Sequence, residues 1–133
     1  CVPGPLCERK RRSRFPAMST ITRIDGGPRM SEAVSLGNRI HCSGMIPEDT
    51  SADITGQVQQ TLAEIDSLLA KSGSDKSKIL TATIWLSDIG DFAAMNEVWD
   101  AWVVPGHTPA RATVQARLSD PNMKVEIMVV AAI

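Results

Sequence analysis

Two charged side chains stand in the most hydrophobic part of the sequence. Arg111 begins a strand-like segment after a proline turn, in TPARATVQ, and Glu126 stands in the apolar final segment VEIMVVAAI. A guanidinium with a fixed direction can bind a carboxylate through two parallel hydrogen bonds, and a carboxylate can act as a general base or position a water molecule. The two residues therefore indicate a site for a small acid. A surface ion pair for Arg111 and an outward-facing position for Glu126 are the simpler interpretations.

The C-terminal part of the chain predicts two strands joined by a turn. In the simplest hairpin, Arg117 pairs with Lys124. Glu126 then lies opposite Gln115, which is four residues, or about 13 Å, along the strand from Arg111. At this separation the two charged side chains need not touch, and a small ligand could lie between them.

Hydrophobic periodicity predicts the elements that position these residues. Apolar residues recur every three or four positions in the region 50–73, which is typical of a helix with one buried stripe. The segment DFAAMNEVWDAWV predicts a second amphipathic helix, capped by Asp91. Its inward-facing residues are predicted to be Phe92, Met95, Val98 or Trp99, and Trp102. Strands are predicted at 20–24, on both sides of a tight turn at Gly37–Asn38, at 78–88, and in the two C-terminal segments.

The order of these elements predicts an α+β fold with about six strands. Two helices can cover only one face of such a sheet. Apolar or small residues are nevertheless expected on the outer face, among them Ala112, Val114, Val129 and Ala131. A sheet that is apolar on both faces, with helices on one side, indicates burial of the other face by oligomerisation.

Composition and charge limit the class of protein. The 133 residues suffice for one domain with a single core. Residues 1–17 hold five of the 14 basic residues and one of the 15 acidic residues, which leaves nine basic and fourteen acidic residues in the rest. We expect a basic leader at 1–17, either disordered or derived from a vector or upstream read-through, and a domain at 18–133. The acidic domain makes nucleic acid an improbable main partner, and no apolar run approaches the ~20 residues of a membrane span.

Familiar catalytic and metal-binding signatures are absent from the sequence. It contains no glycine-rich phosphate loop, nucleophile elbow, H-x-x-x-H or C-x-x-C motif. His41 and His107 have no Asp, Glu or Cys neighbour at ligand spacing, so no metal or other cofactor is predicted. The odd set of three cysteines indicates no disulfide framework, and a reducing cytoplasm fits best.

Several spaced motifs together resemble one known family. GNRIHCSGMIP, DFAAMNEVWDAWV, PARATVQARL and VEI, in this order, are similar to the Rid family of reactive intermediate deaminases, also called the YjgF family, and most closely to its YoaB-like branch. The resemblance runs from Met18 to Ile133. It implies a chorismate-mutase-like fold in a homotrimer with clefts between subunits, and hydrolysis of 2-imino or 2-enamino acids to 2-keto acids and ammonia without a metal or organic cofactor.

The resemblance also assigns roles to residues. It implies that Arg111 holds the substrate carboxylate and that Glu126 assists the attacking water. Further substrate-binding positions fall on Ser43, Gly44, Asn96 and Thr113. Two positions depart from the family pattern, because Met30 replaces a frequent aromatic residue and Thr113 a frequent cysteine. Two alternatives therefore stay open: a protein that binds small 2-keto acids without turnover, and an RNA-cleaving or translation-inhibiting protein.

Overall fold

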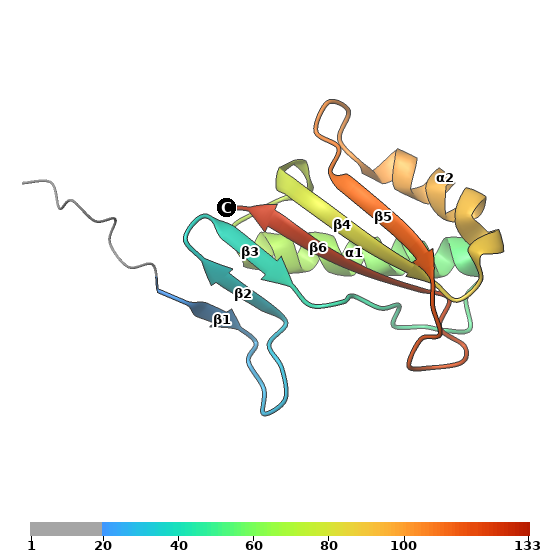
Figure 1. The fold of residues 1–133 in the computed structure, drawn as a ribbon, viewed down its shortest axis with the longest axis horizontal. Helices are drawn as coiled ribbons and strands as arrows, with labels where there is room; N and C mark the ends of the chain where they lie inside the picture. The colour runs from blue at the N-terminus through green and yellow to red at the C-terminus, as the bar shows by residue number, and fades with distance from the viewer. Residues whose placement is uncertain (1–19) are drawn as a thin grey trace, which may run out of the picture.

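Six strands form one mixed sheet in the computed structural model, which describes residues 20–133 (Figure 1). The strands are β1 (Thr22–Ile24), β2 (Ala33–Leu36), β3 (Arg39–Cys42), β4 (Ile79–Leu86), β5 (Ala110–Gln115) and β6 (Val125–Ala132). The α-helices in this part of the chain are α1 (Ile54–Lys71) and α2 (Phe92–Trp102), and short 3-10 helices at Lys76–Lys78 and Ile89–Asp91 precede β4 and α2. The predicted leader at 1–17 lies outside the described residues.

The strand order corrects the predicted C-terminal hairpin. The sheet runs β1-β2-β3-β6-β4-β5, so β4 separates the last two strands, and Arg117 does not pair with Lys124. Strand β5 is parallel to β4, and every other neighbouring pair is antiparallel. A parallel pair needs a crossover connection, which α2 supplies, and the loop 116–124 then returns the chain past β4 to the other side.

The turn between β2 and β3 lies where the sequence predicted it. Leu36 pairs with Arg39, so Gly37 and Asn38 form a two-residue loop. Gly37 has a φ of 63°, whereas Asn38 is not among the described residues with positive φ. A glycine with positive φ at the first central position is typical of a type II′ hairpin turn.

The sequence of α1 explains both of its ends. Asp53 is the N-cap residue, and its carboxylate accepts a hydrogen bond from the Gly56 N–H at 2.9 Å. At the other end Ser72 is the C-cap residue, and Gly73 follows it with a φ of 79°. A left-handed residue that follows the cap ends a helix at little cost when it is glycine.

The start of α2 differs from the prediction. Asp91 occupies the N-cap position but makes no side-chain capping bond. Asp88 acts one turn earlier instead, because its carboxylate accepts from the Gly90 N–H at 2.8 Å and caps the preceding 3-10 helix. Met95 and Trp99 are buried as predicted, but the Phe92 side chain is exposed.

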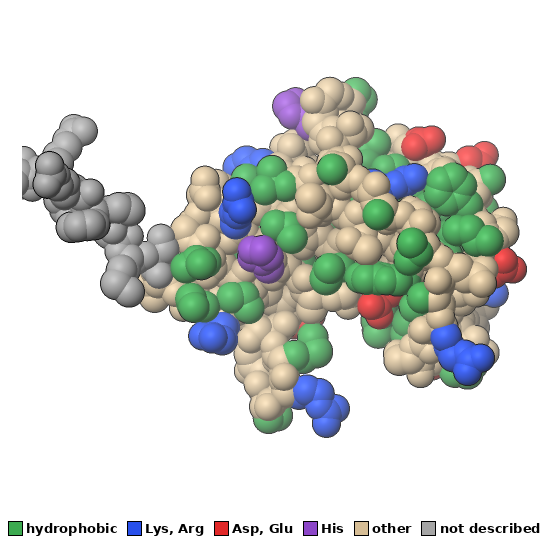
Figure 2. Space-filling model, in the orientation of Figure 1, with side chains coloured by type: hydrophobic (Ala, Val, Ile, Leu, Met, Phe, Trp, Pro, Cys, Tyr) green, Lys and Arg blue, Asp and Glu red, His purple; other side chains and the backbone are tan. Residues whose placement is uncertain are grey.

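Both helices cover the same face of the sheet. In β6, Ile127, Val129 and Ala131 are fully buried beneath α1, whereas Met128 is exposed on the opposite face. The prediction that Val129 and Ala131 face outward is therefore wrong by one position in the alternation. The uncovered face carries many hydrophobic side chains, as Figure 2 shows. Within residues 20–133, neither α-helix combines the length and the apolar character of a membrane span.

Candidate functional site

Arg111 lies at the edge of the sheet against α2. Its guanidinium carbon is 5.2 Å from the centroid of the Trp99 ring and 5.8 Å from that of Phe92. Stacking on aromatic faces fixes the direction of a guanidinium and leaves its N–H donors free for an acid. The ion pair found within residues 20–133 joins Lys71 to Asp25, so the simpler interpretation of Arg111 as half of a surface ion pair does not hold in this part of the chain.

Asn96 and Thr113 lie on the same strand and helix faces as Arg111 and its aromatic neighbours. Thr113 is two residues from Arg111 on β5 and therefore shares its face, and Asn96 shares one helical stripe with Phe92 and Trp99. The Asn96 Oδ1 and Thr113 Oγ1 atoms are buried and have no hydrogen-bond partner. Buried acceptors of this kind require an explanation, and a ligand that supplies donors to them is one. The predicted residues Asn96, Arg111 and Thr113 thus form one group, which we call the β5–α2 edge.

Ser43, Gly44 and Glu126 form a second group, which lines a cleft of about 640 Å³. A Cβ atom at Gly44 would lie 2.7 Å from Oε2 and 2.9 Å from Cδ of Glu126, so only glycine lets the carboxylate lie where it does. The reciprocal hydrogen bonds between Met45 and Ile127, at 2.8 and 3.0 Å, hold the two segments together. We call this region the glutamate cleft.

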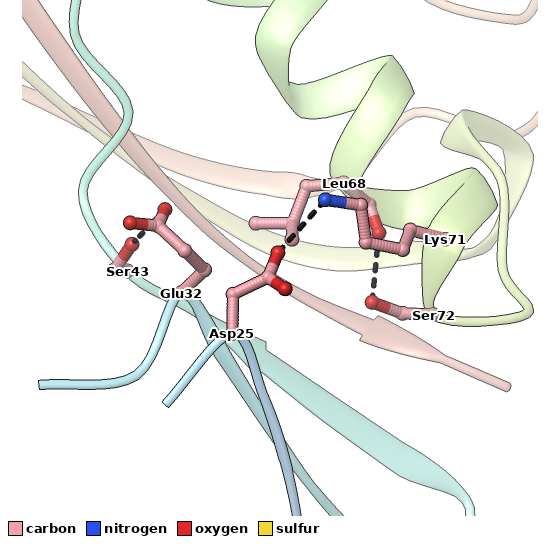
Figure 3. A network of polar contacts seen from close by, with 6 residues as sticks. All are labelled: Asp25, Glu32, Ser43, Leu68, Lys71 and Ser72. Carbon is pink, nitrogen blue, oxygen red and sulfur yellow. Dashed lines mark hydrogen bonds and ion pairs between the residues drawn. The ribbon is translucent and has the colours of Figure 1, made fainter. Parts of the chain in front are cut away.

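Glu32 belongs to the glutamate cleft and was missed in the sequence. The Ser43 hydroxyl donates to its carboxylate at 3.4 Å, and the Ser43 N–H donates to its backbone carbonyl at 2.8 Å (Figure 3). The tight turn at Gly37–Asn38 places residues 32 and 43 opposite each other. The predicted hairpin could therefore have indicated that Glu32 lies next to Ser43. Nearby, the Asp25 carboxylate accepts a hydrogen bond from Lys71 at 2.8 Å and raises the pKa of that amine.

The two groups do not meet within one chain. Arg111 pairs with Ala82 of β4, and Glu126 pairs with Trp85 of the same strand. Three residues separate these positions along β4, an odd number, so Arg111 and Glu126 point to opposite faces of the sheet. Two strand spacings and three residue rises separate their Cα atoms by roughly 14 Å.

Other candidate residues do not join either group. A larger hollow of about 830 Å³ lies beside the loop 116–124 and contains Arg117, but it is lined by none of the predicted site residues. His41 lies on β3 and His107 in the loop after α2. Residues 20–133 contain no group of three His, Cys, Asp or Glu side chains arranged for a metal ion. Burial raises the pKa of the Cys42 thiol to about 11, which agrees with an inert core cysteine.

The fold and its two groups define a class of protein with known members. Residues 20–133 match the family described as Endoribonuclease L-PSP, and the chain belongs to this family, the YjgF or Rid family. The RutC family protein YoaB of Escherichia coli (strain K12) is 54% identical over 114 residues, which cover 86% of this chain and 99% of that protein. A RutC family protein of Haemophilus ducreyi is 49% identical over 113 residues, 85% of this chain and 97% of the relative.

Solved structures agree with the sequence relatives. The crystal structure of NMB1025, a member of the YjgF protein family from Neisseria meningitidis, matches with a TM-score of 0.83 at 49% identity and covers 85% of this chain and 94% of its own. The predicted resemblance to the Rid family and its YoaB-like branch is confirmed, and so is the six-stranded mixed sheet with two helices on one face.

Proposed function

We propose that the protein hydrolyses reactive 2-imino and 2-enamino acids to 2-keto acids and ammonia in clefts between the subunits of a homotrimer. One observation carries this proposal: Arg111 and Glu126 of a single chain, which we propose bind the carboxylate and position the water, lie on opposite faces of the sheet. Each group is one half of a site. A second copy that lays its β5–α2 edge on the glutamate cleft completes it.

Exposed apolar side chains border both halves and support this assembly. Met30 and Ile46 line the glutamate cleft and are exposed. Ile89 and Phe92 are exposed at the start of α2, where Phe92 lies under the Arg111 guanidinium. Contact between two copies would remove this apolar surface from water, which contributes favourably at about 25 cal/mol per Å².

The chemistry needs few groups. The imine R–C(=NH₂⁺)–COO⁻ and water give R–C(=O)–COO⁻ and NH₄⁺: a C–O bond forms at the imine carbon, and the C–N bond breaks once the nitrogen has gained a proton. Arg111 holds the carboxylate, with Asn96 and Thr113 beside it. Glu126, close to Ser43 and Gly44, positions the water and takes up its proton. The imine carbon is already electrophilic, so positioning and charge can supply most of the rate without a metal or organic cofactor.

The direct test is hydrolysis of freshly generated 2-iminopropanoate, followed as ammonia or keto-acid release. We expect acceleration over the spontaneous reaction that is lost in Arg111→Ala and falls at least about 100-fold in Glu126→Gln, the lower end of a general-base contribution. Asp100→Asn, at an exposed position of α2, is the matched control. No acceleration by the wild type with several imino acids would contradict the enzyme and leave carboxylate binding without turnover.

A second candidate function follows from the family's description as an endoribonuclease. RNA cleavage by paired general acid and base finds little support, because His41 and His107 lie on separate elements and residues 20–133 carry fourteen acidic against nine basic residues. Cleavage of single-stranded RNA by the wild type that is lost in Arg111→Ala would favour it.

We also propose the cytoplasm as the location. The support is the free, buried Cys42 thiol, whose pKa of about 11 keeps it protonated. Unpaired core cysteines of this kind are typical of reducing compartments.

A further inference from the structure

Arg111 lies against two aromatic rings that are held in different ways. The Trp99 ring, with its centroid 5.2 Å from the guanidinium carbon, is 5% exposed and packs against Trp102 with ring centroids 5.4 Å apart. Packing in the core therefore fixes this ring. The Phe92 ring, at 5.8 Å, is 41% exposed and belongs to the first residue of α2. Its position depends on how the start of the helix is held.

A side chain of β5 holds the segment from which α2 starts. The Gln115 Oε1 atom accepts a hydrogen bond from the Ile89 N–H at 2.9 Å. Ile89 is the first residue of the 3-10 helix Ile89–Asp91, and Phe92 follows this helix directly. The bond therefore joins β5, which carries Arg111, to the turn before α2 (Figure 1).

Two other bonds of this turn act at different points. The Asp88 carboxylate accepts from the Gly90 N–H at 2.8 Å, and the Ser87 N–H donates to the Lys124 carbonyl at 3.1 Å. The first bond lies within the turn, and the second attaches its beginning to the loop before β6. Neither joins the turn to β5. Without an acceptor from β5, the Ile89 N–H loses its bond and the start of α2 is free to move away from the strand.

Gln115 is too far from Arg111 to touch the same carboxylate. Side chains at alternate positions of a strand share a face, so Arg111, Thr113 and Gln115 lie in one row. Four residues separate the first from the last, which is about 13 Å along the strand. Gln115 can therefore act on the carboxylate only through the turn before α2 and the guanidinium.

The orientation of the guanidinium decides how well it binds a carboxylate. Two parallel N–H···O bonds form only when the guanidinium and the carboxylate lie in one plane. Phe92 and Trp99 both lie within about 6 Å of the guanidinium, the range of a cation–π contact. With Phe92 displaced, Trp99 alone limits the rotation of the guanidinium, and a smaller share of Arg111 conformations suits the paired bonds.

We propose that Gln115 is a positioning residue of the site. Its bond to the Ile89 N–H keeps Phe92 against the guanidinium and so raises the affinity for the substrate carboxylate. This inference rests on the proposed function, in which Arg111 binds that carboxylate. The effect falls on binding and not on the attack of water, because Glu126 belongs to the other group. A loss of binding alone raises KM and leaves kcat unchanged.

The test removes the acceptor while it keeps the length of the side chain. Gln115→Met has no oxygen to accept the bond, whereas Gln115→Glu keeps one. Gln59→Met makes the same change at an exposed position of α1 and is the matched control. In Gln115→Met we expect KM for 2-iminopropanoate to rise about three- to tenfold, the effect of one lost hydrogen bond, with kcat unchanged. Gln115→Glu, assayed in about 0.15 M salt to screen its new charge, and the control should keep the wild-type KM.

A double-mutant cycle tests whether Gln115 acts through Phe92. In Phe92→Leu the ring is absent, so the bond to Ile89 has no ring to position. We expect Gln115→Met to raise KM little further in the Phe92→Leu background, and the effects of the two changes therefore do not add. An equal rise in KM with and without the ring overturns the inference.

The outcomes for the inference and for the proposed function can be told apart. An unchanged KM in Gln115→Met, or an equal rise in Gln115→Glu, overturns the inference, while hydrolysis of 2-iminopropanoate by the wild type leaves the proposed function standing. Should Gln115→Met fail to fold, or to assemble as the wild type does in light scattering, Gln115→Ala replaces it with the same direction expected.

If no imine is hydrolysed, the proposed function fails, and the protein without ligand decides the role of Gln115. Ring currents of Phe92 and Trp99 shift the nuclear magnetic resonance signals of the Arg111 side chain. Signals that move in Gln115→Met and stay in place in Gln115→Glu support the positioning role. Signals that stay in place in both variants overturn it.

Discussion

Two inactive variants should restore each other's activity when their chains are mixed. In the proposed reaction, Arg111→Ala removes the group that binds the carboxylate, and Glu126→Gln weakens the group that positions the water. In one chain these side chains point to opposite faces of the sheet, with Cα atoms roughly 14 Å apart. The proposed cleft therefore takes its arginine from one copy and its glutamate from another.

The size of the recovery follows from this geometry. In trimers reassembled from equal amounts of both variants, half of the clefts receive an intact arginine and, independently, half receive an intact glutamate. Roughly one quarter of the clefts are then complete, in a closed ring of identical interfaces. We expect about a quarter of the wild-type rate above the residual rate of either variant, measured as ammonia release from 2-iminopropanoate after joint unfolding and refolding.

A mixture of the wild type with the double variant Arg111→Ala/Glu126→Gln distinguishes a site within one chain from a site between two chains. If both groups belong to one chain, half of the clefts stay active in an equal mixture; if they belong to two chains, only about a quarter do. The absence of any recovery in mixed, correctly assembled oligomers of the two single variants would refute the reasoning. The oligomers are first sized by light scattering, so that failed assembly is not mistaken for a site within one chain.

Three further predictions concern one residue of the glutamate cleft and two buried residues of the fold. Gly44→Ala should lower kcat/KM at least about tenfold, because the new Cβ meets the Glu126 carboxylate at 2.7 Å. The free energy of unfolding in urea should fall by about 1–3 kcal/mol. An unchanged rate would show that this carboxylate is free to move. Gln57→Ala should lower the free energy of unfolding in urea by about 2–4 kcal/mol, because it removes a buried, fully bonded amide. This amide donates to the carbonyls of Thr50, Ala52 and Asn122 and accepts from the Lys124 N–H. The free energy of unfolding of the wild type should fall above pH 9, because the folded Cys42 pKa of about 11 exceeds the ordinary 9.0 and the unfolded thiol releases its proton first. The fall approaches about 1.4 kcal/mol per pH unit up to pH 11. It is absent in Cys42→Ala.

Local signals in the sequence predicted most elements and their approximate ends. The stripe of α1 and the glycine of the β2–β3 turn act within a few residues, so a single sequence contains them. The pairing of β5 was predicted wrongly because neighbouring segments usually pair with each other. Non-local interactions determine the observed pairing. Helix α2 returns the chain so that β5 runs parallel to β4. Buried Gln57 binds the loop 116–124 although about 65 residues of sequence lie between them.

The sequence predicted one candidate site, whereas the structure places its residues in two separate groups. The family motifs supply six candidate residues, from Ser43 to Glu126, and their roles stay a prediction. Their division between two faces depends on the register of β4 with both its neighbours, which the wrong hairpin concealed. Glu32 was missed for another reason: a single glutamate before a strand is usually solvated, and only the partner opposite it, Ser43, makes it notable.

The central place of β6 has a consequence for how the protein is made. The sheet consists of β1–β3 on one side and β4–β5 on the other, and in the strand order only β6, Val125–Ala132, joins them. These eight residues follow the other five strands in the sequence, so they are synthesised after the segments that they join. Until then the two parts expose unpaired strand edges to other chains. The sheet therefore closes only after β6 has been made, and removal of Val125–Ala132 should divide the sheet rather than shorten it.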